Sequence, residues 1–585
     1  MKITHIRFWA PNAAAVEAQV GHRRHSLARL GNGWWSADVE GFGTLDYGFV
    51  LDGTGPFPDP RSPWQPHGVH GLSRPVDHAA FPWTDQRWQA PPLSSAVFYE
   101  LHIGTFTPEG TFDAAARKLG HLRELGVTHV EFMPVCEFSG PWGWGYDGVD
   151  LYAPHDAYGG PDGLKRLINA CHEAGLAAVL DVVYNHLGPS GNYLSRFGPY
   201  FNPRHHTPWG EAVNLDGPAS PEVRRFFCDN ALMWLRDYHF DGLRLDAVHA
   251  LVDTSAVHFL EQLASEVRRL EAVLGRHLAL IAESDLNDPR VIRPPELGGY
   301  GIHAQWNDDF HHALHSVLTG ERNGYYSDFG SLDQLVKAVT RGFVYDGCYS
   351  GFRDRHHGRP LDGISGRQLV ACLQNHDQVG NRARGDRASH LLNPGRLKTG
   401  AAVLMTAPFI PLLFQGEEWG ASTPFMYFTQ HEDPALAHAV SAGRRGEFIE
   451  FGWVPEEVPD PQARATFEGS KLKWAERDSP AAAGLLAWYS SLIRLRRSVP
   501  ALSDGRMDKV RARADSGILE MRRGPVRLVA NLGPKPVALA AGDNETVLLC
   551  SDPLDRELPP DSVALLGLSQ DAGVRAWLSR SAASR

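Results

Sequence analysis

The feature that most constrains the fold of this chain is a repeated alternation of short apolar segments with helix-like amphipathic segments between about residues 91 and 500. Near-continuous apolar runs are typical of parallel strands that are covered on both faces. Helices are predicted between them, for example over residues 113–125 and 221–238, where apolar residues recur at helical spacing. Eight strands are predicted, over residues 97–103, 129–134, 177–183, 242–247, 279–283, 302–306, 369–375 and 409–414. Eight consecutive units predict a (β/α)8 TIM barrel, because the alternative, a doubly wound sheet, would be expected to carry a Gly-rich nucleotide fingerprint that is missing here.

Strand-and-turn patterns flank this region on both sides. A chain of 585 residues is too long for a single core, so several domains are expected. Both flanks alternate short apolar strands with turns, which is typical of β-sandwiches. The sequence therefore predicts an N-terminal β-sandwich over residues 1–90, a central barrel over 91–500 and a C-terminal β-sandwich over 501–585.

The composition argues against several classes of partner. The net charge is −11 and Lys and Arg form no long run, so no nucleic-acid partner is expected. The N-terminus lacks an apolar signal segment, and the longest apolar runs suit buried strands better than membrane spans, so no membrane partner is expected. The six cysteines form no CxxC pair, which favours reduced thiols in the cytoplasm over disulfides or a zinc site. Neither a cofactor nor a metal is expected, whereas 16 Trp suit a sugar ligand, whose rings stack on aromatic side chains.

Polar residues stand at the carboxyl ends of four predicted strands, where a barrel of this kind carries its reactive side chains. They are Asp181 and His186 at the third strand, Arg244 and Asp246 at the fourth, Glu283 at the fifth, and His376 and Asp377 at the seventh. Taken alone, a carboxylate at a strand end is more often a cap or part of a salt bridge, and a single His is more often a core residue. Their occurrence together, in chain order around one barrel mouth, favours an active site.

Cleavage of a glycosidic acetal needs such a set of side chains, because the leaving oxygen must be protonated and the sugar carbon must be trapped by a carboxylate. Arg244 lies two residues before Asp246, so both side chains point the same way and Asp246 is expected to be an ionised nucleophile. Glu283 follows an apolar run, so partial burial is expected to raise its pKa and make it a general acid. Asp377 is then expected to grip sugar hydroxyls and favour ring distortion.

Four segments closely resemble the conserved regions of the α-amylase family of glycoside hydrolases. They are DVVYNH at 181–186, DGLRLDAVH at 241–249, AES at 282–284 and NHDQ at 375–378. The resemblance covers most of the chain and implies that Asp246 is the nucleophile, Glu283 the acid/base and Asp377 the transition-state stabiliser. It also implies that Tyr146 stacks on the sugar at the cleavage site. A retaining double displacement follows, with two carboxyls about 5–5.5 Å apart.

Further segments resemble the members of this family that hydrolyse the α-1,4 bond next to a terminal trehalose unit. They are RFWAPNAAAVE near the N-terminus, PHGVHG in the connector, WNDDFHHALHSVLTGERNGYY at 306–326 and FQGEEWGASTPF at 414–425. The resemblance implies malto-oligosyltrehalose as substrate, with trehalose and a maltooligosaccharide as products, and assigns Asp308, Asp309 and His311 to the trehalose end. The predicted substrate-binding residues are Tyr146, His186, Arg244, His249, Trp306, Asn307, Asp308, Asp309, His311, His376, Gln378 and Asn381.

Three alternatives remain at this point. A 1,4-α-glucan branching enzyme shares the barrel and the triad, but it would be expected to lack the WNDDFHH cluster. A metal site is the rival explanation for that Asp/His cluster, although calcium-binding amylases carry their oxygen ligands elsewhere. A catalytically inactive glucan-binding barrel would have lost at least one of the three carboxylates, and all three are present.

Overall fold

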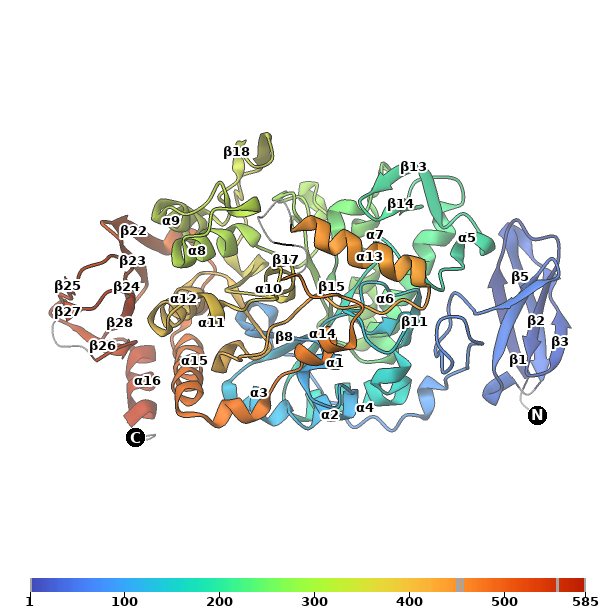
Figure 1. The fold of residues 1–585 in the computed structure, drawn as a ribbon, viewed down its shortest axis with the longest axis horizontal. Coiled ribbons are helices and arrows are strands. Elements are labelled where there is room, and N and C mark those ends of the chain that lie inside the picture. The colour runs from blue at the N-terminus through green and yellow to red at the C-terminus, as the bar shows by residue number, and fades with distance from the viewer. Residues whose placement is uncertain (1–2, 41, 449–453, 455–456, 554–556, 583–585) are drawn as a thin grey trace.

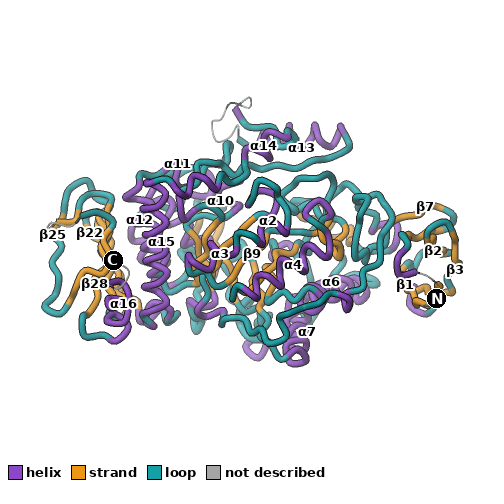
Figure 2. Tube along the Cα trace, turned by 90° about the horizontal axis from the view of Figure 1, so that it is seen from below, coloured by secondary structure: helices purple, strands orange, loops and turns teal. Residues whose placement is uncertain are grey.

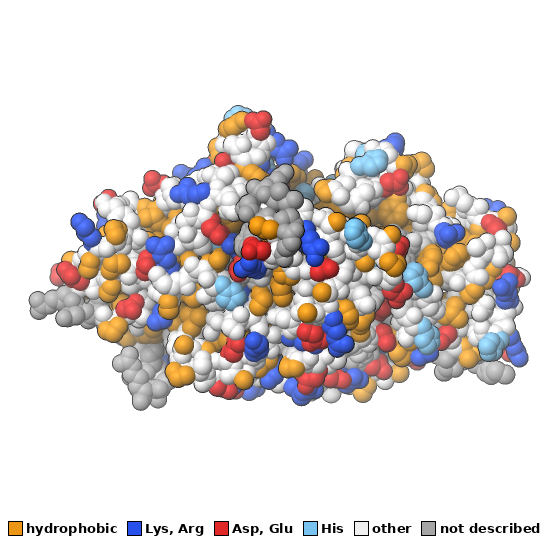
Figure 3. Space-filling model, in the orientation of Figure 1, with side chains coloured by type: hydrophobic (Ala, Val, Ile, Leu, Met, Phe, Trp, Pro, Cys, Tyr) orange, Lys and Arg blue, Asp and Glu red, His pale blue; other side chains and the backbone are white. Residues whose placement is uncertain are grey.

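The computed structural model describes residues 3–40, 42–448, 454, 457–553 and 557–582. Three bodies lie along the long axis, with the N-terminal strands at one end, the barrel in the middle and the C-terminal strands at the other end (Figure 1). Lys/Arg and Asp/Glu side chains are interspersed over the face seen in Figure 3. Within the described ranges, no helix is long and apolar enough to cross a membrane.

The central body is a closed barrel of eight parallel strands, as predicted. In chain order the strands are β8 (Phe98–Leu101), β9 (His129–Phe132), β12 (Ala177–Val182), β15 (Gly242–Leu245), β16 (Ala279–Ala282), β17 (Ala304–Trp306), β20 (Leu369–Cys372) and β21 (Ile410–Phe414). Pairing of β21 with β8 closes the barrel. Each strand lies within its predicted range, and inward-facing apolar side chains such as Phe98, Val179 and Ile281 fill the interior.

Helices cover the outside of the barrel, as the view in Figure 2 shows. The helix predicted over 221–238 is confirmed as α6 (Ser220–Asp237). The single helix predicted over 113–125 is wrong, because α2 (Phe112–Ala116) and α3 (Leu119–Leu125) are separate. Between them, the amide of Lys118 bonds to the carbonyl of Ala115, three residues back, where an α-helix would use the fourth. The apolar stripe on α3 is buried as its spacing predicts, but that spacing does not reveal the break.

The β-rich domains predicted at both ends are confirmed, whereas the boundaries at residues 90 and 500 stay predictions. The N-terminal sheets are β1 (Ile3–Trp9), β5 (Trp34–Glu40) and β4 (Ala28–Arg29), and β3 (Arg23–Ser26), β2 (Val16–Val20), β6 (Tyr47–Leu51) and β7 (Thr54–Phe57). The C-terminal sheets are β22 (Val510–Asp515), β23 (Ile518–Arg523), β24 (Val526–Asn531), β28 (Ser562–Leu568) and β26 (Glu545–Cys550), and β25 (Val537–Ala538) with β27 (Glu557–Leu558).

Candidate active site

A cavity of about 630 Å³ lies at the carboxyl ends of the barrel strands and contains all three predicted catalytic carboxyls. Two hairpins contribute to its wall: β13 (Phe201–Thr207) with β14 (Gly210–Val213), and β18 (Asp346–Ser350) with β19 (Arg355–Gly358). Both project from the same side of the barrel in Figure 1. A larger groove of about 1280 Å³ lies between α9 (Leu332–Arg341) and residues 506–511, and it contains none of the predicted site residues. The chemistry of the lining, and not the volume, therefore identifies the site.

Arg244 on β15 organises one side of the cavity from a fully buried position. Its Nη1 lies 2.9 Å from both carboxylate oxygens of Asp181 and donates to Oδ1 of Asp246 at 2.7 Å. Asn185 Nδ2 donates to the other oxygen of Asp246 at 2.6 Å. The ring of Trp306 covers the guanidinium at 4.3 Å. Donors on both oxygens therefore fix the orientation of Asp246, as expected for a positioned nucleophile.

Glu283 lies directly after β16 and is held by the turn that follows Asp246. Ala247 has φ 40°, in the left-handed region, and its amide donates to Glu283 Oε2 at 2.5 Å. Arg244 Nη2 is 3.5 Å from the same oxygen, so one guanidinium group spans the gap between Glu283 and Asp246. Burial raises the pKa of Glu283 to about 8, with Asp246 and Asp377 adding to the shift and Arg244 opposing it. Glu283 is therefore protonated at neutral pH and can donate a proton.

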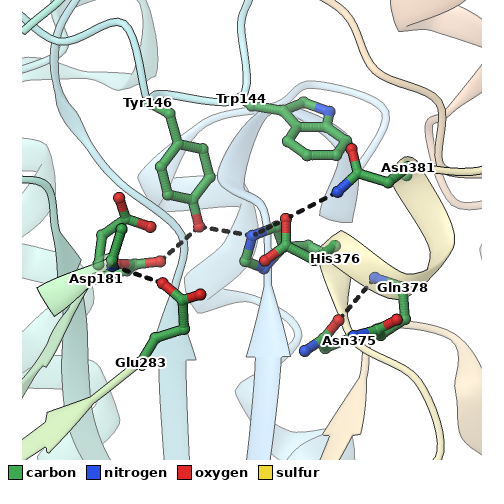
Figure 4. A network of polar contacts seen from close by, with 12 residues as sticks. Trp144, Tyr146, Asp181, Glu283, Asn375, His376, Gln378 and Asn381 are labelled. Carbon is green, nitrogen blue, oxygen red and sulfur yellow. Dashed lines mark hydrogen bonds and ion pairs between the residues drawn. The ribbon is translucent and has the colours of Figure 1, made fainter. Parts of the chain in front are cut away.

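Asp377 lies beside His376 at the start of α10 (His376–Gly380). Its Oδ1 is 3.4 Å from His376 Nε2, and Asn381 Nδ2 donates to the same oxygen at 3.4 Å. Burial alone would raise the pKa of Asp377, but His376 outweighs it and lowers that pKa to about 2. Figure 4 shows His376 and Tyr146 joined across the cavity floor, with the Tyr146 hydroxyl extending to Asp181. Asp377 is therefore ionised and positioned by a connected network.

Half of the predicted substrate-binding residues line the cavity. These residues are Tyr146, His186, His249, Asp308, Gln378 and Asn381. Burial raises the pKa of Asp308 to about 7, with nearby Asp377 and Asp285 adding to it. The wall thus offers aromatic surface, neutral imidazoles and carboxyls, which are groups that stack on sugar rings or bond to hydroxyls.

The other predicted binding residues lie behind the wall. Asn307 caps α8 (Asp308–Thr319), while His311 Nε2 lies 3.1 Å from the hydroxyl of Tyr326. Asp309 Oδ2 accepts from the amides of residues 344 and 345 and from residue 287. Arg244, Trp306 and His376 also lie outside the lining. Asp309 and His311, which the resemblance assigns to the trehalose end, do not line this cavity, because successive helical side chains point about 100° apart. On α8 only Asp308 and His312, four residues apart, reach the cavity.

Several lining residues were not predicted. Arg353 on the β18–β19 hairpin pairs with Asp285 through both guanidinium ends, at 2.7 and 2.5 Å, and Phe352 beside it enters the wall. Asp147, His312, Tyr325 and Tyr427 also line the cavity. Trp209 is half exposed and stacks on His186 with the ring centroids 4.8 Å apart. Sequence spacing gave no signal for Arg353, since 68 residues separate it from Asp285.

No group of three or more His, Cys, Asp or Glu side chains arranged to hold a metal ion occurs in the described part of the chain. In particular, Asp308, Asp309 and His311 point in different directions from α8 and do not share one ligand position. The carboxyls around the cavity lie near two cations, Arg244 and His376. Burial also raises the pKa values of two of these carboxyls, Glu283 and Asp308.

Comparison with known proteins agrees with this geometry. Residues 80–202 match the family model described as the alpha amylase catalytic domain. The malto-oligosyltrehalose trehalohydrolase of Arthrobacter ramosus is 54% identical over 537 residues, which cover 91% of this chain and 93% of that protein. A crystal structure of a Salmonella typhimurium protein has a TM-score of 0.90 at 39% identity, and the match covers 97% of this chain and 98% of that chain.

A branching enzyme, the alternative considered above, is a more distant match. The 1,4-alpha-glucan branching enzyme of Vibrio parahaemolyticus is 32% identical over 360 residues, which cover 53% of this chain and 47% of that protein. The similarity to the Arthrobacter protein is higher and extends over nearly the whole of both chains. This chain therefore belongs to the malto-oligosyltrehalose trehalohydrolase family of α-amylase-type glycoside hydrolases.

Proposed function

We propose that this protein is a retaining hydrolase that cleaves the α-1,4 bond next to the terminal trehalose unit of malto-oligosyltrehalose. The observation that carries the proposal is the arrangement of Asp246, Glu283 and Asp377 around one cavity, in a chain of this family. The proposed products are trehalose and a maltooligosaccharide.

In the first step, Glu283 donates its proton to the glycosidic oxygen and trehalose leaves. Asp246 attacks the anomeric carbon of the departing bond and forms a glycosyl ester with the maltooligosaccharide. The carboxylate of Asp377 binds ring hydroxyls and favours the distorted, oxocarbenium-like ring. The pKa of Glu283, raised to about 8, supports this role, because the side chain carries a proton at neutral pH.

In the second step, Glu283 is ionised and removes a proton from water, which attacks the same carbon and releases the maltooligosaccharide. Two inversions give net retention of the α configuration. Arg244 supports both steps, because it contacts Asp246 and lies within 3.5 Å of Glu283. It stabilises negative charge as that charge passes between the two carboxyls.

For the trehalose end we propose Asp308 as a direct contact, with its neighbour Asp309 shaping the wall. Asp308 lines the cavity, and a carboxyl with a pKa of about 7 can both donate to and accept from sugar hydroxyls. Asp309 binds the backbone amides that precede the β18–β19 hairpin, which carries Phe352 and Arg353. The hairpin position thus depends on Asp309 even though Asp309 does not reach the cavity.

The test is a product assay on maltotriosyltrehalose. We expect equal amounts of trehalose and maltotriose by chromatography, with the new reducing end first appearing as the α anomer by proton NMR. Glucose or maltose as the first product would overturn the substrate assignment, and the β anomer would overturn the retaining mechanism. A change in the iodine colour of amylose without new reducing ends would instead indicate branching.

We also propose that the protein works in the cytoplasm. All six cysteines are free, and four of them are buried. Free thiols are typical of proteins in reducing compartments. Fractionation of the source cells, followed by assay of trehalose release, would test this proposal, and activity confined to the medium would contradict it.

A further inference from the structure

Glu100 lies on β8 at the floor of the active site and is 1% exposed. Both of its carboxylate oxygens contact His376. Oε2 accepts a hydrogen bond from the backbone amide of His376 at 2.9 Å, and Oε1 lies 2.5 Å from Nδ1 of the His376 ring. Glu100 therefore holds the backbone and the side chain of His376 at once. Among the described residues, no other side chain forms a hydrogen bond or ion pair with His376 Nδ1, so this carboxylate alone fixes that end of the ring.

The other end of the His376 ring also faces acceptors. Nε2 lies 2.7 Å from the Tyr146 hydroxyl and 3.4 Å from Asp377 Oδ1. The Tyr146 hydroxyl donates its own proton to Asp181 Oδ2 at 2.6 Å, so its oxygen can only accept from His376 (Figure 4). An imidazole with an acceptor at each nitrogen must donate from both, which requires the charged ring. Burial lowers the pKa of His376, but Asp377 and Glu100 outweigh it and raise that pKa well above its usual value.

We propose that Glu100 is a positioning residue for the hydrolysis: it keeps His376 doubly protonated and fixed, so that the Nε2–H stays directed at Tyr146 and Asp377. The inference rests on the proposed function, because Asp377 acts on a sugar bound in the cavity. Glu100 touches no substrate and does not line the cavity, so it acts only through His376.

The charged and titratable groups that surround His376 come from several elements. They are Glu100 on β8, His102 after β8, Glu131 on β9, Tyr146 in the loop after β9, Asp181 on β12 and Asp377 on α10. Burial lowers the pKa of His102 to about 3, so His102 is neutral. Glu100 and Asp377 are thus the anions that make direct contact with the ring.

Glu131 provides a matched control in the same layer of the barrel. It is the register partner of Glu100 on the neighbouring strand and is also 1% exposed. Neither of its carboxyl oxygens has a hydrogen-bond partner among the described residues. Burial, with Glu100 and Asp181 adding to it, raises the pKa of Glu131 well above the usual range, so this acid is neutral. Substitution by glutamine therefore preserves both shape and charge at position 131, whereas at position 100 it preserves the shape alone.

The experiment compares Glu100→Gln with Glu131→Gln, using trehalose release from maltotriosyltrehalose between pH 5 and 10. Glutamine at position 100 can accept from only one of the two His376 donors and carries no charge. We expect kcat to fall about 10- to 100-fold with KM changed less than about threefold, as for loss of a charge-assisted hydrogen bond. Without Glu100, Asp377 is the largest remaining influence that opposes burial, so the pKa of His376 falls. We therefore expect His376, in place of Glu283, to set the alkaline limb of the kcat profile in Glu100→Gln and to move that limb to lower pH. Glu131→Gln is expected to keep kcat within about twofold and the profile unshifted.

A second readout does not depend on activity. Nitrogen NMR of 15N-histidine-labelled protein reports whether both ring nitrogens carry a proton, and the His376 signal is identified by its loss in His376→Gln. We expect a doubly protonated His376 at pH 8 in the wild type and in Glu131→Gln, and loss of one proton in Glu100→Gln.

Several outcomes would overturn the inference. An unshifted pH profile in Glu100→Gln would do so, as would an equal loss of kcat in Glu131→Gln, or a neutral His376 in the wild type.

If Glu100→Gln does not fold, Glu100→Asp replaces it. That variant keeps the charge but shortens the reach, and we expect a smaller loss of kcat with the same direction of shift, so an unshifted profile there also overturns the inference. A wild type that releases no trehalose would refute the proposed function alone, since the NMR comparison still decides the role of Glu100.

Discussion

The guanidinium of Arg244 lies 2.7 Å from the carboxylate of Asp246, two residues further along the chain. Alternation along a strand places both side chains on the inner side of the barrel. The same Nη1 lies 2.9 Å from both oxygens of Asp181, while Nη2 approaches Glu283. One planar group thus ties three carboxyls together, which an ammonium on a flexible stem would not do.

The first prediction concerns Arg244→Lys. A lysine can keep one of the three carboxyl contacts, so Asp246 and Glu283 are no longer held in place by one shared group. Misplacement of a reacting group by about 1 Å costs roughly 100-fold in rate, and we expect kcat to fall by about that factor. Steady-state kinetics on maltotriosyltrehalose measure the change. Arg290 is half exposed and pairs with Asp288 outside the cavity, so Arg290→Lys is the matched control and should keep wild-type kcat. A value of kcat for Arg244→Lys within threefold of the wild type would contradict the prediction.

The second prediction separates the proton-donating role of Glu283 from folding. Glu283 is neutral at pH 7, so Glu283→Gln preserves shape and charge and should leave the melting temperature unchanged. Loss of a general acid typically costs about 10²- to 10⁴-fold. We expect that loss on maltotriosyltrehalose but a much smaller loss on α-maltosyl fluoride, because fluoride leaves without protonation. Equal losses on the two substrates would argue against the acid assignment.

The third prediction is the pH dependence of kcat/KM. Burial raises the pKa of Asp181 to about 6 and that of Glu283 to about 8. Below pH 6 Asp181 becomes protonated and releases Arg244 and Tyr146, so activity falls as the pH decreases. Above pH 8 Glu283 loses its proton and can no longer protonate the leaving group, so activity falls as the pH increases. A plateau between about pH 6 and 8 is expected in initial-rate measurements. An alkaline limb above pH 10 would show that another group controls protonation.

The barrel and the three carboxyls could be predicted because their signals are local. A strand covered on both faces is a short apolar run, and a polar residue at its end stands out against it. Asp246, Glu283 and Asp377 each follow such a run. The wall of the cavity could not be predicted in the same way, because contacts such as Arg353 with Asp285 join segments 68 residues apart.

The orientation of the polar cluster at residues 307–309, after β17, could not be predicted from the sequence pattern either. Asn307, Asp308 and Asp309 are consecutive polar residues, and nothing in their composition tells which one faces the substrate. The answer depends on where α8 begins. Asn307 accepts a hydrogen bond from the amide of Phe310 as the helix cap, which sets the rotation of every residue that follows.

The fourth prediction uses this rotation to separate recognition from folding. Asp309 Oδ2 accepts from three buried donors, so Asp309→Ala leaves them unpaired and should lower the free energy of unfolding by about 3 kcal/mol. Asp308→Ala removes a cavity carboxyl whose pKa is raised to about 7 by burial, so stability should hold or increase. Its kcat/KM for malto-oligosyltrehalose should fall more than its kcat/KM for a maltooligosaccharide of equal length. Urea titrations and paired kinetics measure both effects, and the reverse pattern would show that Asp309 contacts the trehalose unit.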